Sequence, residues 1–333
     1  MSERIRVLII ADSALRSEAI AAILSSDPSI WVIGTARNGE EGREKANILK
    51  PDVITIELKT PVMRGLKAIE KIMEESPISI IVISDMDVNV TVKALSIGAM
   101  DFVLLTREIE EISRDLIEKV KIAARVKPVR RIKVNSTVAA GPVPKKSVSK
   151  VVAIGVSTGG PQALQMILAK LPSDFNAGIL IVQHMANGFI GGLAEWLRSG
   201  SFLDVRVAAE GDILKSATVF LAPDNYNTRI TDNGIISLSK DTGGAKGHVP
   251  SVDIMMKSVA DSFGHDAVGV IMTGMGRDGG EGIRAIKRTG GITIAQDEKT
   301  SVVFGMNKAA IETGHVDKVV PLEEIAYRII EVV

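Results

Sequence analysis

The chain contains no cysteine, which excludes disulfide bonds, thiolate metal sites and a cysteine nucleophile. Aromatic residues make up only 3% of its 333 residues, so its cores must be built from valine, isoleucine, leucine, alanine and methionine. Forty basic residues balance forty acidic ones, which leaves no general attraction to nucleic acid or to an acidic membrane surface. We therefore expect no nucleic-acid partner.

Long apolar runs are also missing. No run approaches the roughly 20 residues that a membrane span needs, so we expect no membrane insertion. The first residues, MSERIRVLIIADS, lead straight into a strand pattern without the apolar region and cleavage site of a signal peptide. These features predict a cytoplasmic protein, and the length predicts two domains.

Residues 1–124 alternate short apolar runs with stretches of helical periodicity. We predict strands at 5–10, 31–35, 53–57, 80–83 and 102–105, and helices near 14–25, 39–49, 64–75, 88–97 and 108–124. Five strand–helix units in a row are typical of a parallel sheet that helices cover on both faces. The pattern predicts an α/β domain of the (βα)5, flavodoxin-like type.

Residues 125–150, RVKPVRRIKVNSTVAAGPVPKKSVSK, have three prolines, many basic residues and no acidic one. Such a segment buries too little apolar surface to offset its ordering entropy, so we predict a basic flexible linker. Residues 151–333 then begin a second alternating series, with apolar runs at 151–154, 179–182, 268–272 and 292–295. We predict a doubly wound, mainly parallel α/β domain. An antiparallel hairpin insertion is expected near 204–240, with turns at Asp224-Asn225 and Asn233-Gly234.

The run VVAIGVSTGGPQALQMIL holds a G-x-S-x-G pattern at residues 155–159, between a predicted strand and a predicted helix. Glycines on either side of Ser157 permit a tight turn that exposes its hydroxyl, and Pro161 suits the first turn of the helix. The start of that helix offers N–H groups to a developing oxyanion. Two other interpretations stay open, a glycine-rich turn without chemistry and an anion cradle for a nucleotide, although the G-K-[S/T] phosphate-loop pattern is absent.

A serine nucleophile needs a base, and the chain has four histidines, His184, His248, His265 and His315. His184 ends the run ILIVQH. If that strand lies beside the strand of Ser157 in a parallel sheet, both residues reach the edge where sites of open α/β sheets gather. Asp278, in the glycine-rich segment after AVGVIMTGM, could orient the imidazole. The residues alone favour a catalytic triad modestly over a nucleotide site, and a surface or capping role for His184 stays open.

Five segments, VVAIGVSTGGPQAL, IVQHMANGF, GHVPSVDIMMKSVA, GVIMTGMGRDGGEG and TIAQDEKTSVVFGMNKAAI, resemble the successive motifs of the CheB family of chemotaxis methylesterases. The resemblance covers residues 151 to about 325. It implies that Ser157, His184 and Asp278 form the triad and that main-chain N–H groups around Thr158 and Met275 hold the oxyanion. The family usually has His-Arg-Pro-Ser-Val-Asp where this chain has Val249 after His248, so any role of that arginine is absent.

The family resemblance implies a protein-glutamate methylesterase that hydrolyses glutamyl methyl esters on methyl-accepting chemotaxis receptors and releases methanol. It also implies a possible second reaction, the deamidation of receptor glutamine through the same acyl-enzyme. Methylated chemoreceptors are the expected partners, with a chemotaxis histidine kinase as a further candidate. The alternative is a non-catalytic adaptor that only binds receptors; the complete Ser157, His184 and Asp278 set argues against it.

The first 124 residues resemble a response-regulator receiver, in the segments VLIIADSALR, PDVITIELKTPVMRGL, IIVISDM and GAMDFVLLT. A receiver needs two acids after its first strand for Mg²⁺, a phosphoacceptor Asp and a Lys. This chain has Ala11-Asp12, then Glu57 at the acceptor position and Leu105 at the lysine position. Ser84 keeps the hydroxyl position, and Phe102 keeps the switch aromatic.

These departures predict a degenerate receiver that is not phosphorylated. One carboxylate fewer argues against a Mg²⁺ ion, Glu57 is a methylene too long for in-line attack, and Leu105 cannot pair with a phosphate. We expect no cofactor and no metal. Two interpretations of Glu57 stay open: it mimics the phosphorylated state, or it is a relic in a docking domain.

Overall fold

The computed structural model describes residues 4–58, 62–85, 87–105, 108–126, 128, 148–240 and 248–333. The chain divides into two compact units, Met1–Lys133 and Val134–Val333, called here the N-terminal and the C-terminal unit. Most of the basic linker predicted at 125–150 lies outside the described residues, so the boundaries at 124 and 150 stay predictions.

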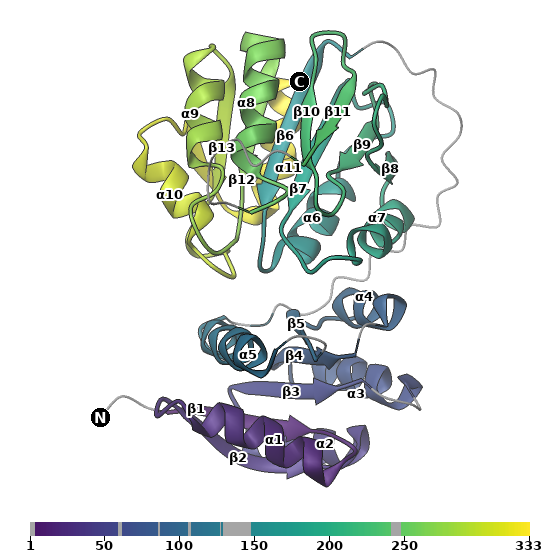
Figure 1. Ribbon diagram of the computed structural model, residues 1–333, viewed down its shortest axis with the longest axis vertical. Helices are drawn as coiled ribbons and strands as arrows, with labels where there is room; N and C mark the ends of the chain where they lie inside the picture. Colours follow the sequence, from purple (N-terminus) through teal and green to yellow (C-terminus); the bar gives the residue numbers. More distant parts are fainter. Residues whose placement is uncertain are drawn as a thin grey trace. The chain divides into compact units, whose positions relative to one another are not determined.

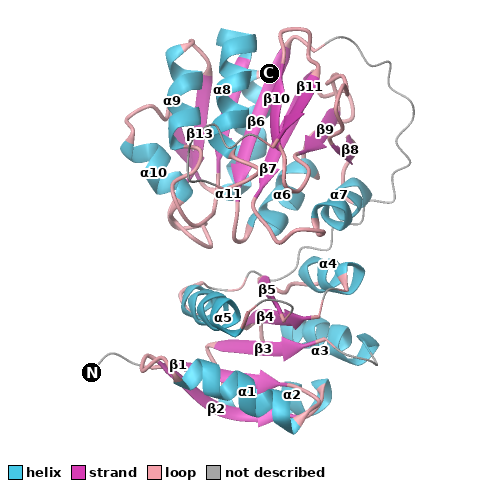
Figure 2. Cartoon of the chain, in the orientation of Figure 1, coloured by secondary structure: helices cyan, strands magenta, loops and turns pink. Residues whose placement is uncertain are grey.

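The N-terminal unit alternates strands and helices from end to end (Figures 1 and 2). Its elements are β1 (Ile5–Ile10), α1 (Ala14–Ser25), β2 (Ile30–Ala36), α2 (Gly39–Leu49), β3 (Val53–Glu57), α3 (Val62–Glu75), β4 (Ser79–Ser84), α4 (Val88–Ser96), β5 (Asp101–Leu104) and α5 (Ile109–Ala123). All five predicted strands and all five predicted helices are confirmed to within a few residues at each end.

The five strands form one parallel sheet in the order β2-β1-β3-β4-β5, the flavodoxin-like order. Alternate residues of a strand face opposite sides, so Val7 and Ile9 of β1 pack with apolar residues of α1 and α5. Helices α2, α3 and α4 cover the other face (Figure 1). Covering both faces leaves the carboxyl ends of the strands as the open edge.

The C-terminal unit is a larger α/β assembly with a small insertion. Its elements are β6 (Lys150–Val156), α6 (Gly160–Leu168), β7 (Ala177–Gln183), α7 (Ile190–Ser199), β8 (Asp204–Val207), β9 (Thr218–Leu221), β10 (Asn227–Ile230), β11 (Ile236–Ser239), α8 (Val252–Phe263), the 3₁₀ turn η1 (Gly264–Asp266), β12 (Ala267–Ile271), α9 (Gly280–Arg288), β13 (Ile292–Gln296), α10 (Met306–Glu312), β14 (Lys318–Val320) and α11 (Leu322–Val332).

Seven of these strands form a parallel sheet in the order β14-β13-β12-β6-β7-β9-β8. Along β6, Val152, Ile154 and Val156 pack with α6, α7 and α11. The intervening Val151 and Ala153 pack with α8, α9 and α10 on the other face. The chain runs from β6 to its neighbour β7, then to the edge strand β8 and back to β9 between them, and later continues to β12 on the other side of β6. This reversal creates the crevice in which open α/β sheets hold their sites.

The antiparallel insertion expected near 204–240 is confirmed as a separate two-stranded sheet of β10 and β11. Both predicted turns are present, and Asn225 and Gly234 adopt the left-handed conformation, with φ of 63° and 74°. Strands β8 and β9 instead pair in parallel with the main sheet. Among the described helices, none is both long and apolar enough to cross a membrane.

Candidate active site

Ser157 lies at the carboxyl end of β6, at the start of the turn into α6, and is partly exposed. Its main-chain N–H donates to the carbonyl of Thr273 at 3.0 Å, which ties the turn to the end of β12. Two glycines permit the turn that follows. Gly159 has φ of 77°, and a Cβ on Gly160 would lie 2.1 Å from Oε1 of Gln183.

His184 follows the last residue of β7, the parallel neighbour of β6. Its main-chain N–H donates to the carbonyl of Val156 at 3.0 Å. The buried amide of Gln183 donates both to the carbonyl of Ser157 at 2.9 Å and to that of His184 at 2.8 Å. The prediction that the serine and the histidine reach the same sheet edge is therefore confirmed.

Asp278 lies in the loop between β12 and α9, and its side chain is only 13% exposed. Its carboxylate accepts from Nε2 of His184 at 2.9 Å, from Oγ of Ser251 at 3.0 Å, and from the main-chain N–H groups of Val252 at 2.8 Å and Asp253 at 2.9 Å. Three of these donors sit at the start of α8, where unpaired N–H groups favour an anion.

Burial acts to raise the pKa of Asp278. The hydrogen bonds from His184 and from the N–H groups of Asp253 and Val252 outweigh burial and leave this pKa below its ordinary value. A carboxylate that stays ionised in a nearly buried position is suited to hold a protonated imidazole beside it.

Asp253, in the first turn of α8, makes the corresponding contacts to the start of α9. Its carboxylate accepts from the N–H groups of Gly279 at 3.0 Å and Gly282 at 2.7 Å, which belong to the start of α9. Asp278, just before α9, holds the start of α8 in turn. The start of each helix therefore donates to a carboxylate at or just before the start of the other helix. These hydrogen bonds fix Asp278 at the edge of the sheet.

The imidazole of His184 makes its hydrogen bond to Asp278 through Nε2. If Nε2 carries the proton, the lone pair of Nδ1 is left to act as a base. Nδ1 is buried and has no hydrogen-bond partner among the described residues. The more familiar triad binds its aspartate through Nδ1, so this ring has the opposite orientation.

The predicted triad requires the hydroxyl of Ser157, the imidazole of His184 and the carboxylate of Asp278 to lie within hydrogen-bonding reach of each other. The imidazole and the carboxylate form this hydrogen bond. No hydrogen bond between the Ser157 hydroxyl and His184 occurs in the described part of the chain. A serine hydroxyl rotates among staggered positions, and contacts of this kind commonly tighten only when substrate binds. The two residues are nevertheless adjacent through their main chains.

The two predicted oxyanion donors lie on the turns next to Ser157. Thr158 follows the serine, and Met275 lies in the loop after β12, with 42% of its surface exposed. Neither main-chain N–H donates to another residue within the described ranges. Both N–H groups can therefore donate to a bound oxyanion, as oxyanion donors must.

Thr273 is a functional candidate that the sequence reasoning missed. Its side chain is buried, and its Oγ1 donates to the carbonyl of Thr158 at 2.9 Å and accepts from the N–H of Val303 at 2.9 Å. The buried Gln296 accepts the Thr273 N–H at 2.9 Å. This network fixes the peptide that follows Thr158, beside the predicted oxyanion position.

Ser251, Asp253 and Gln183 were also missed as supporting residues. The motif segments GHVPSVD and IVQH contain all three, so the family resemblance carried the only available signal. Ser251 and Asp253 bond residues 25 to 29 positions away, and Gln183 bonds Ser157, which follows another strand. Periodicity gives no information on such pairings.

The corresponding edge of the N-terminal unit holds Glu57, the last residue of β3. Its side chain is 2% exposed and forms an ion pair with Nη1 of Arg16 on α1. Arg16 was not singled out from the sequence. Its guanidinium places a positive charge at the carboxylate, in the region where a receiver is expected to bind a metal ion.

The structure also describes the surroundings of the other residues predicted at this edge. Ser84 is buried, and its hydroxyl bonds that of Thr91 at 2.7 Å. Leu105 packs against the apolar core of the unit. Asp12 is exposed. No group of three or more acidic or histidine side chains that could hold a metal occurs in the described ranges.

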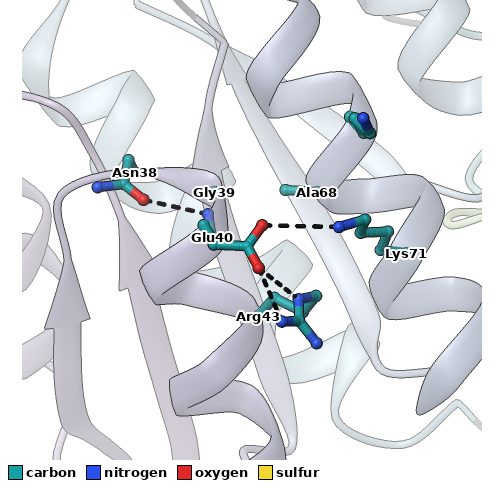
Figure 3. Close-up of a pocket in the computed structure, with 7 residues that line it drawn as sticks. Asn38, Gly39, Glu40, Arg43, Ala68 and Lys71 are labelled. Atoms are coloured by element: carbon teal, nitrogen blue, oxygen red, sulfur yellow. Dashed lines mark hydrogen bonds and ion pairs between the residues drawn. The ribbon is translucent and has the colours of Figure 1, made fainter.

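A cavity of about 320 Å³ lies between α2 and α3 of the N-terminal unit (Figure 3). Three of its charged side chains, Glu40, Arg43 and Lys71, pair with one another or with the nearby Glu75. Arg43 contacts Glu40 at 2.7 Å and Glu75 at 3.0 Å, and Lys71 lies 3.7 Å from Glu40. Because these charges are largely compensated, we assign the cavity no ligand.

Comparison with known families agrees with this geometry. The CheB methylesterase family matches residues 152–329, and the response regulator receiver domain matches residues 7–116. The crystal structure of the Thermotoga maritima CheB methylesterase catalytic domain is similar with a TM-score of 0.53 and 41% sequence identity. The match covers 55% of this chain and 98% of that one.

Full-length relatives match across both units. A protein-glutamate methylesterase/protein-glutamine glutaminase of Pyrococcus horikoshii is 42% identical, over 100% of this chain and 95% of its own. A protein of the same name from Halalkalibacterium halodurans is 39% identical, over 99% of both chains. The chain therefore belongs to the CheB methylesterase family and is a methylesterase with an N-terminal response regulator receiver domain.

Proposed function

We propose that this methylesterase hydrolyses glutamyl methyl esters on chemoreceptors by a Ser-His-Asp mechanism, with Ser157 as nucleophile, His184 as base and Asp278 as the orienting acid. The observation that carries the proposal is the His184–Asp278 hydrogen bond of 2.9 Å at the edge where Ser157 begins its turn. Methylated chemoreceptors are the proposed substrates because the family acts in chemotaxis.

In the first half of the reaction, Oγ of Ser157 attacks the ester carbonyl while its proton passes to Nδ1 of His184. The carbonyl oxygen becomes an oxyanion, to which the N–H groups of Thr158 and Met275 donate. When this intermediate collapses, the bond to the methoxy oxygen breaks. Methanol leaves with the proton from His184, and an acyl-enzyme remains on Ser157.

In the second half, water gives a proton to His184 and attacks the acyl carbon. The bond to Oγ of Ser157 breaks, the serine recovers its proton, and a glutamate carboxylate is released. The ionised Asp278 stabilises the imidazolium in both halves. The same steps convert glutamine into glutamate with ammonia as the leaving group, so we propose deamidation as a second activity.

Methanol release from a receptor fragment that carries methylated glutamates tests this proposal. Wild-type protein should release methanol, and Ser157→Ala should bind the fragment without releasing any. Ser199→Ala, at an exposed serine of α7, is the matched control and should behave as wild type. Receptor binding without methanol release by the wild type would favour the adaptor alternative.

We further propose that the receiver domain is not phosphorylated and that regulation, if present, is independent of phosphoryl transfer. The acceptor position holds a glutamate that is buried against Arg16. The residues present do not fit Mg²⁺, because that ion needs several oxygen ligands in a near-octahedral arrangement and a guanidinium competes for Glu57. Ser84 bonds Thr91, and Leu105 provides no charge.

Incubation of the full chain with acetyl phosphate and Mg²⁺, followed by intact-mass measurement, tests the receiver proposal. No covalent phosphate is expected, and a phosphorylated Glu57 would falsify it. Comparing methanol release by the full chain with that by residues 150–333 then shows whether the receiver domain restrains the site, and the Glu57→Gln variant of the full chain separates the two roles of Glu57. A Glu57 that mimics phosphorylation predicts that Glu57→Gln slows the full chain, and a relic predicts no change.

The remaining sequence expectations belong to the same proposal. A chemotaxis histidine kinase is a candidate partner because a receiver domain is present, although phosphoryl transfer from it is not expected here. A cytoplasmic location stays a prediction, as does the absence of a cofactor.

A further inference from the structure

The imidazole of His184 has a second neighbour besides Asp278. The ring of His248 stacks on it with a centroid distance of 4.6 Å and an angle of 27° between the ring planes. Such stacking is within the usual range for attractive aromatic pairs. His248 was one of the four histidines noted in the sequence, and neither the triad nor the oxyanion site uses it.

A single hydrogen bond leaves the orientation of an imidazole incompletely defined. The bond from Nε2 of His184 to Asp278 fixes the position of one ring atom, but the ring plane can still turn about that contact. Nδ1 makes no second hydrogen bond within the described part of the chain. A flat partner against the ring face supplies the missing restraint.

The segment that carries His248 is well anchored. Pro250 is buried, and the N–H of Ser251 donates to Oδ1 of the buried Asn227 at 2.8 Å. The same short segment supplies three of the four donors to Asp278. One stretch of chain therefore contacts both the imidazole and the carboxylate that orients it.

We propose that His248 is a positioning residue, whose ring fixes the plane of the His184 imidazole and thereby presents Nδ1 to the nucleophile. The proposal rests on the proposed function, in which His184 is the base. It concerns orientation: His248 itself transfers no proton.

The charge state of His248 suits this role. Burial and the nearby His184 lower its pKa from the ordinary value of 6.5, although Asp278 acts in the opposite direction. The ring is therefore neutral at pH 7 and does not repel the imidazolium that forms on His184. Asp278 is the acidic group that acts on His248, and Asp253 at the start of α8 acts on Asp278 while its carboxylate accepts N–H groups at the start of α9.

Steady-state methanol release by full-length variants tests the proposal. His248→Ala removes the ring, and kcat should fall by roughly 10- to 100-fold, with KM within about twofold, because a catalytic group displaced by about 1 Å can cost that much. His248→Phe keeps a flat ring without nitrogen atoms, and its kcat should stay within about threefold of wild type. His265→Ala, at an exposed histidine outside the site, should be unchanged.

Two results would overturn the proposal. A wild-type kcat in His248→Ala would show that the stack has no effect. A His248→Phe variant as slow as His248→Ala would show that a nitrogen of His248, rather than its ring face, is needed. His248→Leu, which fills the space without a ring, should match His248→Ala and decides the question if the alanine variant fails to fold.

This test and that of the proposed function fail differently. Wild-type protein that releases no methanol would contradict the proposed function itself. The positioning role of His248 is judged only by comparison among variants of an active enzyme whose thermal unfolding shows that they are folded.

Discussion

In the C-terminal unit, the acid at the carboxyl edge of the sheet is held mostly by main-chain and hydroxyl donors, whereas in the N-terminal unit it is held by a cation. Asp278 accepts two main-chain N–H groups, a serine hydroxyl and the imidazole. Glu57 is paired with the guanidinium of Arg16. Glu57 is the last residue of a buried parallel strand, and Asp278 lies in the loop after one.

The difference decides what each edge can do. The hydrogen-bond donors at the start of α8 stabilise the ionised form of Asp278. Because its carboxylate also bonds the imidazole of His184, the two residues can work as an acid–base pair. The ion pair with Arg16 instead places a positive charge beside Glu57. In the functions proposed above, the same architecture therefore hosts a reactive site in one unit and an edge that is not phosphorylated in the other.

The largest expected effect is on Ser157. Ser157→Ala should lower kcat by about a millionfold, the loss seen when a serine nucleophile is removed in related chemistry. The measurement is methanol release, with thermal unfolding to confirm an intact fold. Residual turnover within tenfold of wild type would contradict the nucleophile and remove the main contrast between the two edges.

Asp278→Asn should lower kcat by on the order of 10⁴-fold, because an amide cannot hold the same tautomer or stabilise the imidazolium. KM should change little, since the residue does not contact the substrate in this mechanism. Asp266→Asn, at another acid of the C-terminal unit, serves as control. An unchanged kcat in Asp278→Asn would show that the histidine is oriented by other groups.

The pH dependence of stability sharpens the role of Asp278. Its pKa in the folded protein is below the ordinary 3.8, so its contribution to the free energy of unfolding is complete above about pH 4 and is lost as the pH falls through the folded value. In Asp278→Asn, the free energy of unfolding should therefore fall less steeply as the solution is acidified. Urea unfolding between about pH 2.5 and 6, which spans the ordinary carboxyl range, measures this. An identical pH dependence of the free energy of unfolding in the variant and the wild type would contradict the lowered pKa of Asp278.

A smaller effect is expected at Thr273. Thr273→Val keeps the shape but removes the hydroxyl that bonds Thr158 and Val303, so kcat should fall about tenfold and stability by about 1–2 kcal/mol. Thr273→Ser restores the hydroxyl and should recover kcat. If the serine variant is as slow as the valine variant, the hydroxyl does not position the oxyanion turn.

The last prediction concerns the stability of the N-terminal unit. Arg16→Ala removes the guanidinium from a buried carboxylate and should destabilise the unit by roughly 2 kcal/mol, measured by urea unfolding. Lys45→Ala breaks the ion pair with Glu41, whose side chain is much more exposed than that of Glu57, and should cost less. Equal effects of the two variants would mean that the Arg16–Glu57 pair contributes no more than a surface contact.

Much of this molecule follows from local patterns. Strand and helix periods gave every element of the N-terminal unit, and Gly155 to Pro161 marked the turn of Ser157. Parallel neighbours bring their carboxyl ends to one edge, so His184 could be placed beside the serine before any contact was known. The resemblance to a family supplied Asp278, which the residues alone only suggested.

The sequence by itself determined the elements, the strand ends and the residue types at each edge, because those depend on neighbours a few positions away. Only the tertiary structure decided that Arg16 meets Glu57 across 41 residues and that His248 lies on His184. Such contacts depend on strand order and helix packing. Periodicity within a segment carries no information about which distant segment packs against it.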